Sequence, residues 1–265
     1  MDNRRSYPSD LSKPEWAQVE RFIPPPKPGG RPAEPDPKDI VDALLDVART
    51  GCQGRALPHD FPPWGTVYRS FRTWKADGTL DRRRDARRGD RRAAAGRHRQ
   101  PSAAIIDSRS VKTTEKRGVR GYDGGKKVTG RTRPILVDTL GLILAVVVHA
   151  ADVPDADGAK LLLESIRGRS RRLKLVWAAG ADRRIADWVA AWRPAPPVRL
   201  EVVEKAAEGL VALPRRWVVE RTLAWLGRRR RLSKDYEATT GSGEAFIELA
   251  MAHLMARRRV KRLNR

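Results

Sequence analysis

Two isolated acidic residues, Asp107 and Glu220, have the surroundings expected of metal-binding carboxylates. Asp107 ends the apolar run AAIID, which predicts a short buried strand. Glu220 is the one acid among eight Lys and Arg residues in the segment 215–234. Mg²⁺ and Mn²⁺ prefer carboxylate oxygens, and two such ions about 4 Å apart can activate an attacking oxygen and stabilise a leaving one. Carboxylates from separate segments can therefore build a site for phosphodiester chemistry.

Each of these acids also has an ordinary structural explanation. Asp107 can accept hydrogen bonds from residues 108–110 as an Asx-type cap. Glu220 can form a surface ion pair with Arg216, one helical turn earlier. Which explanation applies depends on whether the fold brings the two acids together with further carboxylates.

The composition favours a polyanionic partner. The 265 residues carry a formal net charge of +23, a field that holds a protein on nucleic acid, on an anionic membrane or on an acidic partner. The longest apolar run, residues 141–151, is too short to cross a bilayer, and the N-terminus lacks the apolar core of a signal peptide. The single cysteine, Cys52, excludes an intrachain disulfide and a Cys-based zinc cluster. We therefore expect a cytoplasmic, nucleoid-associated protein that binds DNA and no membrane.

Residues 1–80 are expected to form a small all-α, DNA-binding region. The capping-box pattern SKPE begins one helix at residue 13, and a helical apolar pattern over 38–50 ends at Gly51. A third helix follows Thr66 and carries Val67, Phe71 and Trp74 at helical spacing. Its basic side chains suit a helix-turn-helix-like module, and a plain helical bundle that braces a neighbouring domain fits the pattern equally.

Residues 81–101 are expected to form an Arg-rich linker. The stretch DRRRDARRGDRR contains one apolar residue, Ala86, so no face of a helix can be buried there. We expect a solvated connector that is partly helical or disordered. Such a segment can also follow a phosphate backbone.

Residues 102–265 predict an α/β domain with a mixed sheet. Strands are expected at residues 103–107, 135–139, 142–149, 173–178 and 198–203, and the second and third of them should pair as a hairpin. Helices are expected at residues 159–167, 185–192, around Glu220, and at 246–263. The Gly- and Lys-rich residues 118–133 should form a loop or flap. An acid at the end of the first strand, a hairpin and a late helical acid together indicate a ribonuclease-H-like fold.

Several long stretches resemble bacterial transposases of the insertion-sequence-five type. The family's catalytic domain is similar to AAIIDSRSVKTTEKRGVRGYDGGKKVTGR, ILVDTLGLILAVVVHAADVPDADGAKLLL and LPRRWVVERTLAWLGRRRRLSKDYE. Its N-terminal region is similar to YPSDLSKPEWAQVERFIPPPKPGGRP and RTGCQGRALPHDFPPWGTVYRSFRTWKADGT, so the resemblance runs from residue 7 to residue 259. It implies a DDE enzyme whose Asp, Asp and Glu bind two Mg²⁺ or Mn²⁺ ions. Those ions support cleavage at the element's ends and transfer of the 3′-hydroxyl into target DNA.

The resemblance implies catalytic and metal-binding roles for Asp107, which matches the first acid, and for Glu220, which matches the last. Arg216 matches the basic residue that precedes the family's Glu by one helical turn. The family has Trp-Ala-Asp-Gly-Gly-Tyr around its second acid, and this chain has WAAGAD, so Ala179 occupies the position of the second Asp. Asp182 is the nearest substitute, although it can also cap the following helix.

Because a methyl group cannot bind a metal ion, the resemblance implies weakened or absent catalysis in this copy. Four further acids can be considered as substitutes, and hairpin-turn and helix-start positions explain them more simply: Asp138, Asp152, Asp155 and Asp157. Arg109 stands where the family commonly has Gln. Three arginines replace the apolar stripe of the family's linker helix, which should therefore detach or fray: Arg83, Arg87 and Arg91.

The resemblance implies double-stranded DNA as the partner, both as terminal inverted repeats and as target DNA, bound by a homodimer. The basic residues that we expect to contact DNA are Arg69, Arg72, Lys75, Lys112, Lys126, Lys127, Arg216, Arg221, Arg228, Arg229 and Lys234. One alternative is a non-catalytic DNA-binding protein, a decayed transposase that occupies the terminal repeats. A structural polycation that coats nucleic acid is a weaker alternative, because it leaves Asp107 and Glu220 unexplained.

Overall fold

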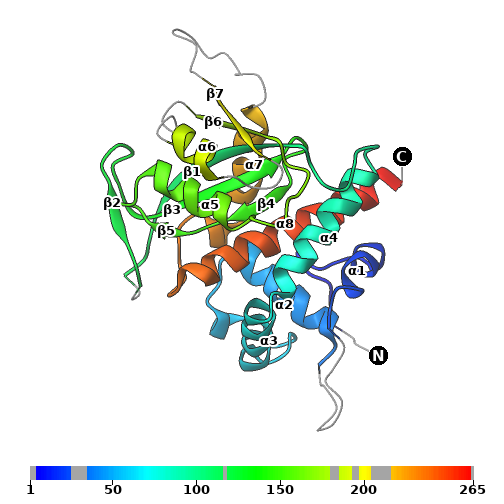
Figure 1. Ribbon diagram of the computed structural model, residues 1–265. Helices are drawn as coiled ribbons and strands as arrows, with labels where there is room; N and C mark the ends of the chain where they lie inside the picture. The colour runs from blue at the N-terminus through cyan, green and yellow to red at the C-terminus, as the bar shows by residue number, and fades with distance from the viewer. Residues whose placement is uncertain are drawn as a thin grey trace.

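A mixed β-sheet with helices on both faces forms the larger part of the protein (Figure 1). The computed structural model describes residues 4–24, 35–115, 118–179, 185–192, 197–203 and 216–263. Within these residues the N-terminal helices lie against the long C-terminal helix rather than apart from the sheet domain (Figure 1). The fold class predicted from the sequence, a ribonuclease-H-like α/β domain preceded by helices, is confirmed.

The first two N-terminal helices begin and end where local sequence signals place them, whereas the third begins at Trp64, before the Thr66 that was predicted to cap it. The three helices are α1 (Lys13–Glu20), α2 (Pro37–Thr50) and α3 (Trp64–Ala76), with a short 3₁₀ turn, η1 (Gly54–Ala56), between the last two. The Ser12 hydroxyl and the Glu15 carboxylate form the predicted capping box of α1. Gly51 ends α2 with φ of 75°, a left-handed conformation that glycine adopts without steric cost.

These helices share one hydrophobic core with the C-terminal half of the chain. Leu44 of α2 and Phe71 of α3 belong to the same buried cluster as Met251 of α8 (Thr240–Leu263) and Ile105 of the sheet. The rings of Phe71 and Phe246 lie 4.9 Å apart. The orientation of the N-terminal helices is therefore set by burial against α8 and not by a flexible tether.

Residues 81–92 form part of a buried helix, α4 (Thr79–Ala93), which packs against α8. The prediction of a solvated connector that detaches or frays is wrong for this segment. Arg84, Arg88 and Arg92 are all buried. Their aliphatic stems cover apolar surface while their guanidinium groups meet acceptors that lie elsewhere in the sequence.

The partners of these arginines come from three different elements. Arg84 donates to Glu248 of α8. Arg88 donates to the carbonyl oxygen of Ile143 at 3.2 Å, and Arg92 donates to Asp138 Oδ2 at 2.7 Å. A buried charge is tolerated when it is paired and hydrogen-bonded in this way. The arrangement depends on acceptors 46 to 164 residues away, which the composition of the segment does not reveal.

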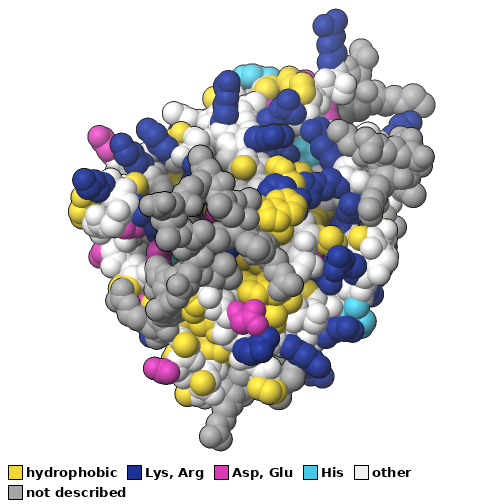
Figure 2. All heavy atoms as spheres, turned by 90° about the horizontal axis from the view of Figure 1, so that it is seen from above, with side chains coloured by type: hydrophobic (Ala, Val, Ile, Leu, Met, Phe, Trp, Pro, Cys, Tyr) yellow, Lys and Arg dark blue, Asp and Glu magenta, His cyan; other side chains and the backbone are white. Residues whose placement is uncertain are grey.

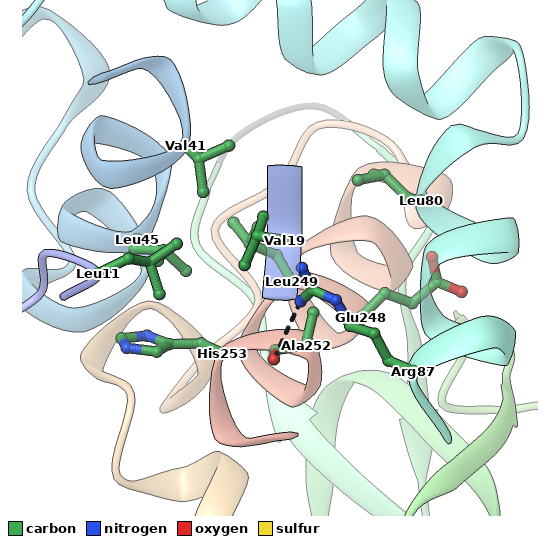
Figure 3. Close-up of a pocket in the computed structure, with 10 residues that line it drawn as sticks. All are labelled: Leu11, Val19, Val41, Leu45, Leu80, Arg87, Glu248, Leu249, Ala252 and His253. Carbon is green, nitrogen blue, oxygen red and sulfur yellow. Dashed lines mark hydrogen bonds between the residues drawn. The ribbon is translucent and has the colours of Figure 1, made fainter. Parts of the chain in front are cut away.

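Arg87 is less well satisfied than its neighbours on α4. Its side chain is 6% exposed and lies at a small apolar pocket where α4 and α8 meet α1 and α2 (Figure 3). Nη1 donates to the carbonyl oxygen of Ala252 at 3.2 Å, while Nε and Nη2 find no hydrogen-bond partner among the described residues. Burial, with a contribution from Arg21, lowers the pKa of Arg87 to about 10. At this replaced apolar position the structure therefore shows a poorly compensated charge.

The sheet contains β1 (Ala103–Lys112), β2 (Gly121–Asp123), β3 (Val128–Asp138), β4 (Ile143–Val146), β5 (His149–Ala150), β6 (Leu175–Ala179) and β7 (Arg199–Val203). Its main path runs in the order β2-β3-β1-β6-β7, with β4 and β5 also paired to β3. β1 is antiparallel to β3 and parallel to β6, which is in turn parallel to β7. The predicted hairpin is confirmed as β3 and β4, joined at Gly141.

Two sequence-based expectations for the sheet are wrong. β1 does not end at Asp107 but continues to Lys112, because its second half pairs with β3. The segment 118–133 is not a plain loop, since its described part contains β2 and the first residues of β3. Gly130 allows this pairing, because a Cβ there would lie 2.0 Å from the carbonyl oxygen of Val111.

Alternate residues of the central strands face opposite layers of helices. Ile106 and Val176 pack with α5 (Asp155–Glu164) and α6 (Ala186–Trp192) on one face. Ile105 and Trp177 face the other core, which contains residues of α7 (Trp217–Gly227) and α8. No helix in the described part of the chain is long and apolar enough to cross a membrane.

The buried carboxylate of Asp235 joins the sheet to the helices on this second face. Asp235 follows the 3₁₀ turn η3 (Arg230–Leu232), which connects α7 to α8. Arg131 Nη1 lies 3.0 Å from Oδ1, and Arg133 Nη2 lies 3.3 Å from Oδ2. The backbone N–H of Asp235 also donates to the carbonyl oxygen of Lys112 at 2.8 Å. The connection between α7 and α8 is thus held to both β1 and β3.

We expect Asp235→Ala to lower the free energy of unfolding by about 3–5 kcal/mol, because it leaves two buried guanidinium groups without their carboxylate. Equilibrium urea unfolding followed by circular dichroism measures the change. Asp157→Ala is the matched control, because the Asp157 side chain is 52% exposed in its pair with Lys160. A loss below about 1 kcal/mol, the range of surface pairs, would show that Asp235 does not hold the helices to the sheet.

Arg87→Leu should stabilise the protein by about 1–3 kcal/mol, because it removes buried donors that lack partners and fills apolar space. Thermal unfolding measures the change. Arg84→Leu is the opposite control, since it strands Glu248 and should lower the melting temperature. A lower melting temperature for Arg87→Leu would mean that the bond to the carbonyl oxygen of Ala252 outweighs the unsatisfied donors.

Candidate active site

Asp107 lies on β1 at the level where that strand stops pairing with β6. Ile105 is the last residue of β1 paired to β6, and Asp107 follows it by two positions. By strand alternation Asp107 shares the sheet face of Ile105, the face on which α7 packs. Its half-buried carboxylate accepts a hydrogen bond from the N–H of Ser108 at 2.9 Å.

Ala179 is the last residue of β6 and occupies the corresponding position on the neighbouring strand. Trp177 pairs with Ile105 in the parallel register, and Ala179 lies two residues beyond Trp177. Asp107 and Ala179 thus each lie two residues beyond the last pair of these parallel strands, at the same edge of the sheet. On its other edge Ala179 pairs with Val203 of β7.

Glu220 is presented by α7, which packs against β1 and β3. Its side chain is 58% exposed, and Arg216 Nη2 lies 3.8 Å from Oε1. The surface ion pair considered for Glu220 is thus present, at a distance longer than a hydrogen bond. Thr222 fixes the helix by donating to the carbonyl oxygen of Gly141 at 2.9 Å.

The charges around Asp107 show that the two acids share one electrostatic environment. Burial raises the pKa of Asp107, and the negative charge of Glu220 raises it further. The N–H of Ser108 and the charges of Arg216 and Lys126 oppose that rise. The fold therefore brings Asp107, Glu220, Arg216 and Lys126 within electrostatic reach of one another, from three separate segments of the chain.

Three of the five acids considered as substitutes for the residue at Ala179 are already paired with other side chains. Asp138 is buried and binds Arg92, Asp155 binds Lys126 and Ser108, and Asp157 binds Lys160. Asp152 is exposed beside Gly121, and Asp182 lies outside the described residues. Among the residues that the structure describes, no three His, Cys, Asp or Glu side chains form a group that could hold a metal ion. Within the described part of the chain, the acids do not complete a site built from three carboxylates.

The basic residues expected to contact DNA differ in how exposed their side chains are. Seven are exposed: Arg69, Arg72, Lys112, Lys126, Lys127, Arg228 and Lys234. Four are half-buried: Lys75, Arg216, Arg221 and Arg229. Figure 2 shows one face of the protein, on which Lys and Arg side chains clearly outnumber acids. Lys126 is exposed but already bound to Asp155.

Arg221 belongs to a stack of aromatic and cationic side chains that sequence reasoning missed. Its guanidinium lies 4.3 Å from the ring centroid of Trp217 and 4.5 Å from that of Trp225, and the guanidinium of Arg258 lies 3.4 Å from the ring centroid of Trp225. Burial lowers the pKa of Arg221 and lowers that of Arg258 to about 10. The spacing of residues 217, 221 and 225 on one helical face was the signal available in the sequence.

Arg229, just after the C-terminal end of α7, also contacts a neighbouring element. Its Nη2 lies 3.2 Å from His253 Nδ1 of α8. Burial, together with the charges of Arg257 and Arg49, lowers the pKa of Arg229 to about 10. Arg221 and Arg229 therefore also hold α7 and its C-terminal turn against their neighbours.

The sheet order, the acid on β1 and the acid on a helix packed against β1 define a ribonuclease-H-like domain of the DDE class. Comparison with known families agrees. Residues 98–255 match the family "Transposase DDE domain", and residues 11–83 match the family "Putative transposase of IS4/5 family". The first match covers more than half of the chain, so the chain belongs to the DDE transposase family, of the IS4/5 type. No curated protein is significantly similar to it.

Membership confirms the resemblance noted in the sequence and places the chain among DNA strand transferases and endonucleases. Enzymes of this family generally use divalent metal ions, and a transposase acts on DNA. The two matches leave residues 84–97 between them, most of which belong to the buried helix α4.

Proposed function

We propose that this chain is an insertion-sequence transposase that binds the element's ends but cleaves and transfers strands weakly or not at all. The observation that carries the proposal is the register of β1 and β6, in which Asp107 and Ala179 each lie two residues beyond the last pair, Ile105 and Trp177. Two-metal chemistry needs a carboxylate on each of these neighbouring strands. The chain has an alanine at one of them.

In this proposal Asp107 and Glu220 are the remaining metal-binding and catalytic carboxylates, and Arg216 balances part of their negative charge. With the second acid restored, the site would hold two Mg²⁺ or Mn²⁺ ions. Residues 1–80 would bind DNA, residues 81–101 would join the two parts, and residues 102–265 would form the catalytic domain. Two element ends would be held by a homodimer.

DNA contact is proposed for the basic residues named from the sequence. The exposed members of that set, such as Arg69, Arg228 and Lys234, can pair with phosphates without breaking a contact of the fold. The half-buried Arg221 and Arg229 are already engaged by aromatic rings and by His253, so their contribution to DNA binding should be smaller.

A second candidate function is specific DNA binding without catalysis. The same alanine favours it, because the basic surface and the hydrophobic core of the helices are intact while the acid set is not. Such a protein would occupy the terminal inverted repeats and could compete with intact copies of the transposase.

Ala179→Asp should restore metal binding and cleavage. Losing an outer-shell partner of a metal site already costs about 10–100-fold, so regaining a metal ligand should raise the cleavage rate by at least about 100-fold. The assay is strand cleavage of a labelled duplex carrying an element end, with Mg²⁺ or Mn²⁺. A thermal shift on adding Mn²⁺, seen in the variant and not in the native chain, gives a second readout.

Ala178→Asp is the matched control, because Ala178 is the preceding residue of the same strand and belongs to the opposite core. The double variant Ala179→Asp with Asp107→Asn should lose what Ala179→Asp regains. Full cleavage by the native chain would overturn the proposal of impaired catalysis.

Binding to an element end should be tight, independent of added metal and steeply dependent on salt. A protein that makes 6–10 phosphate contacts loses about 10³–10⁵ in affinity between 50 and 200 mM salt. Fluorescence anisotropy with an end duplex and a scrambled duplex, each in EDTA, measures this. Equal affinity for the two duplexes would contradict both candidate functions and favour a non-specific polycation.

A further inference from the structure

A large groove separates α3 from the segment that leads into α8. Its N-terminal wall contains Trp64, Tyr68 and Arg72 of α3, together with Arg55 of η1. Its other wall contains residues 236–239, and its volume is about 1190 Å³. Clefts for small organic ligands usually measure about 300–1,000 Å³, so this groove suits an extended ligand.

The N-terminal wall carries a stacked pair of aromatic rings. Trp64 and Tyr68 lie one helical turn apart, with ring centroids 5.7 Å apart and planes inclined by 30°. The indole of Trp64 rests on Gly54, where a Cβ would come within 1.9 Å of the ring. Tyr68 is 45% exposed although it is a large aromatic side chain. The fold thus seats one ring firmly and leaves the other open to solvent.

Cations without partners flank these rings. Arg55 and Arg72 are exposed, and neither forms a hydrogen bond or an ion pair with any described residue. Lys75, one turn beyond Arg72, reaches only Ser242 at 3.3 Å. On the opposite wall the charge of Arg231 is balanced by Glu237 at 2.7 Å. The open positive charge therefore lies on the same side as the aromatic pair.

We propose that this groove binds an unpaired segment of DNA, with a base stacked on Tyr68 and the flanking phosphates bound by Arg55 and Arg72. An open ring beside free guanidinium groups is the arrangement that recognises single-stranded nucleic acid, because every base presents a flat face and every linkage a phosphate. The bases of an intact duplex are already stacked on one another and cannot use the ring.

This inference rests on the proposed function, since it names a further part of the DNA that the transposase holds. The unpaired segment would be single-stranded DNA next to an element end, and the groove is separate from Asp107 and Glu220. Stacking contributes about 1–3 kcal/mol per base, which corresponds to a gain of about 5- to 150-fold in affinity for DNA with an unpaired extension.

The experiment compares a blunt duplex with the same duplex carrying a three-nucleotide extension that contains 2-aminopurine. We expect the full-length protein to bind the extended DNA at least 5-fold more tightly and to quench the 2-aminopurine fluorescence. Tyr68→Ala should abolish both the preference and the quenching while binding the blunt duplex as before. Arg55→Ala with Arg72→Ala should weaken binding of the extended DNA and reduce its salt dependence.

Tyr122→Ala is the matched control, because Tyr122 is 58% exposed on β2 and is absent from the groove. It should change neither readout. Equal binding of the two DNAs, or quenching that survives Tyr68→Ala, would overturn the inference while leaving the proposed function intact. Failure of the native chain to bind either DNA would instead refute the proposed function, and the inference with it.

Discussion

The geometry of the candidate active site depends on one buried carboxylate shared by two arginines. Asp235 receives Arg131 and Arg133 from β3, and its backbone joins the end of β1. Because Asp235 lies in the connection between α7 and α8, the same contact sets the helix that carries Glu220 against the strand that carries Asp107. Because buried charges need close, directional partners, this contact restricts movement of α7 along the sheet.

Helix α4 is also held in place by buried, paired charges, although its Arg-rich sequence favours a solvated segment. Arg84, Arg88 and Arg92 enter the interior because each meets a carboxylate or a carbonyl oxygen. Arg87 meets only one acceptor and retains donors without partners in the described structure. Part of the charge of this protein, whose net charge is +23, thus lies in the interior. There the hydrogen-bond acceptors of each guanidinium group affect stability more than the number of charges does.

The exposed basic side chains and the candidate metal-binding acids differ in how many residues their chemistry needs at once. The DNA contacts that we propose rest on exposed arginines and on the exposed ring of Tyr68, which the fold does not need for its own contacts. In the proposed function the metal-binding chemistry needs several carboxylates at once, and position 179 offers an alanine. Loss of one ligand would then affect catalysis far more than it affects DNA binding.

Local patterns in the sequence determined most helices and most strands, the family, and the identity of Asp107 and Glu220 as the acids to examine. Capping at Ser12 and the stop at Gly51 are signals between near neighbours, so they can be read without a fold. Only the tertiary structure decided that α4 is buried, because its partners lie as far away as Glu248. It likewise decided that Asp107 and Ala179 each lie two residues beyond the last pair of β1 with β6, since strand register is a relation between segments more than 70 residues apart.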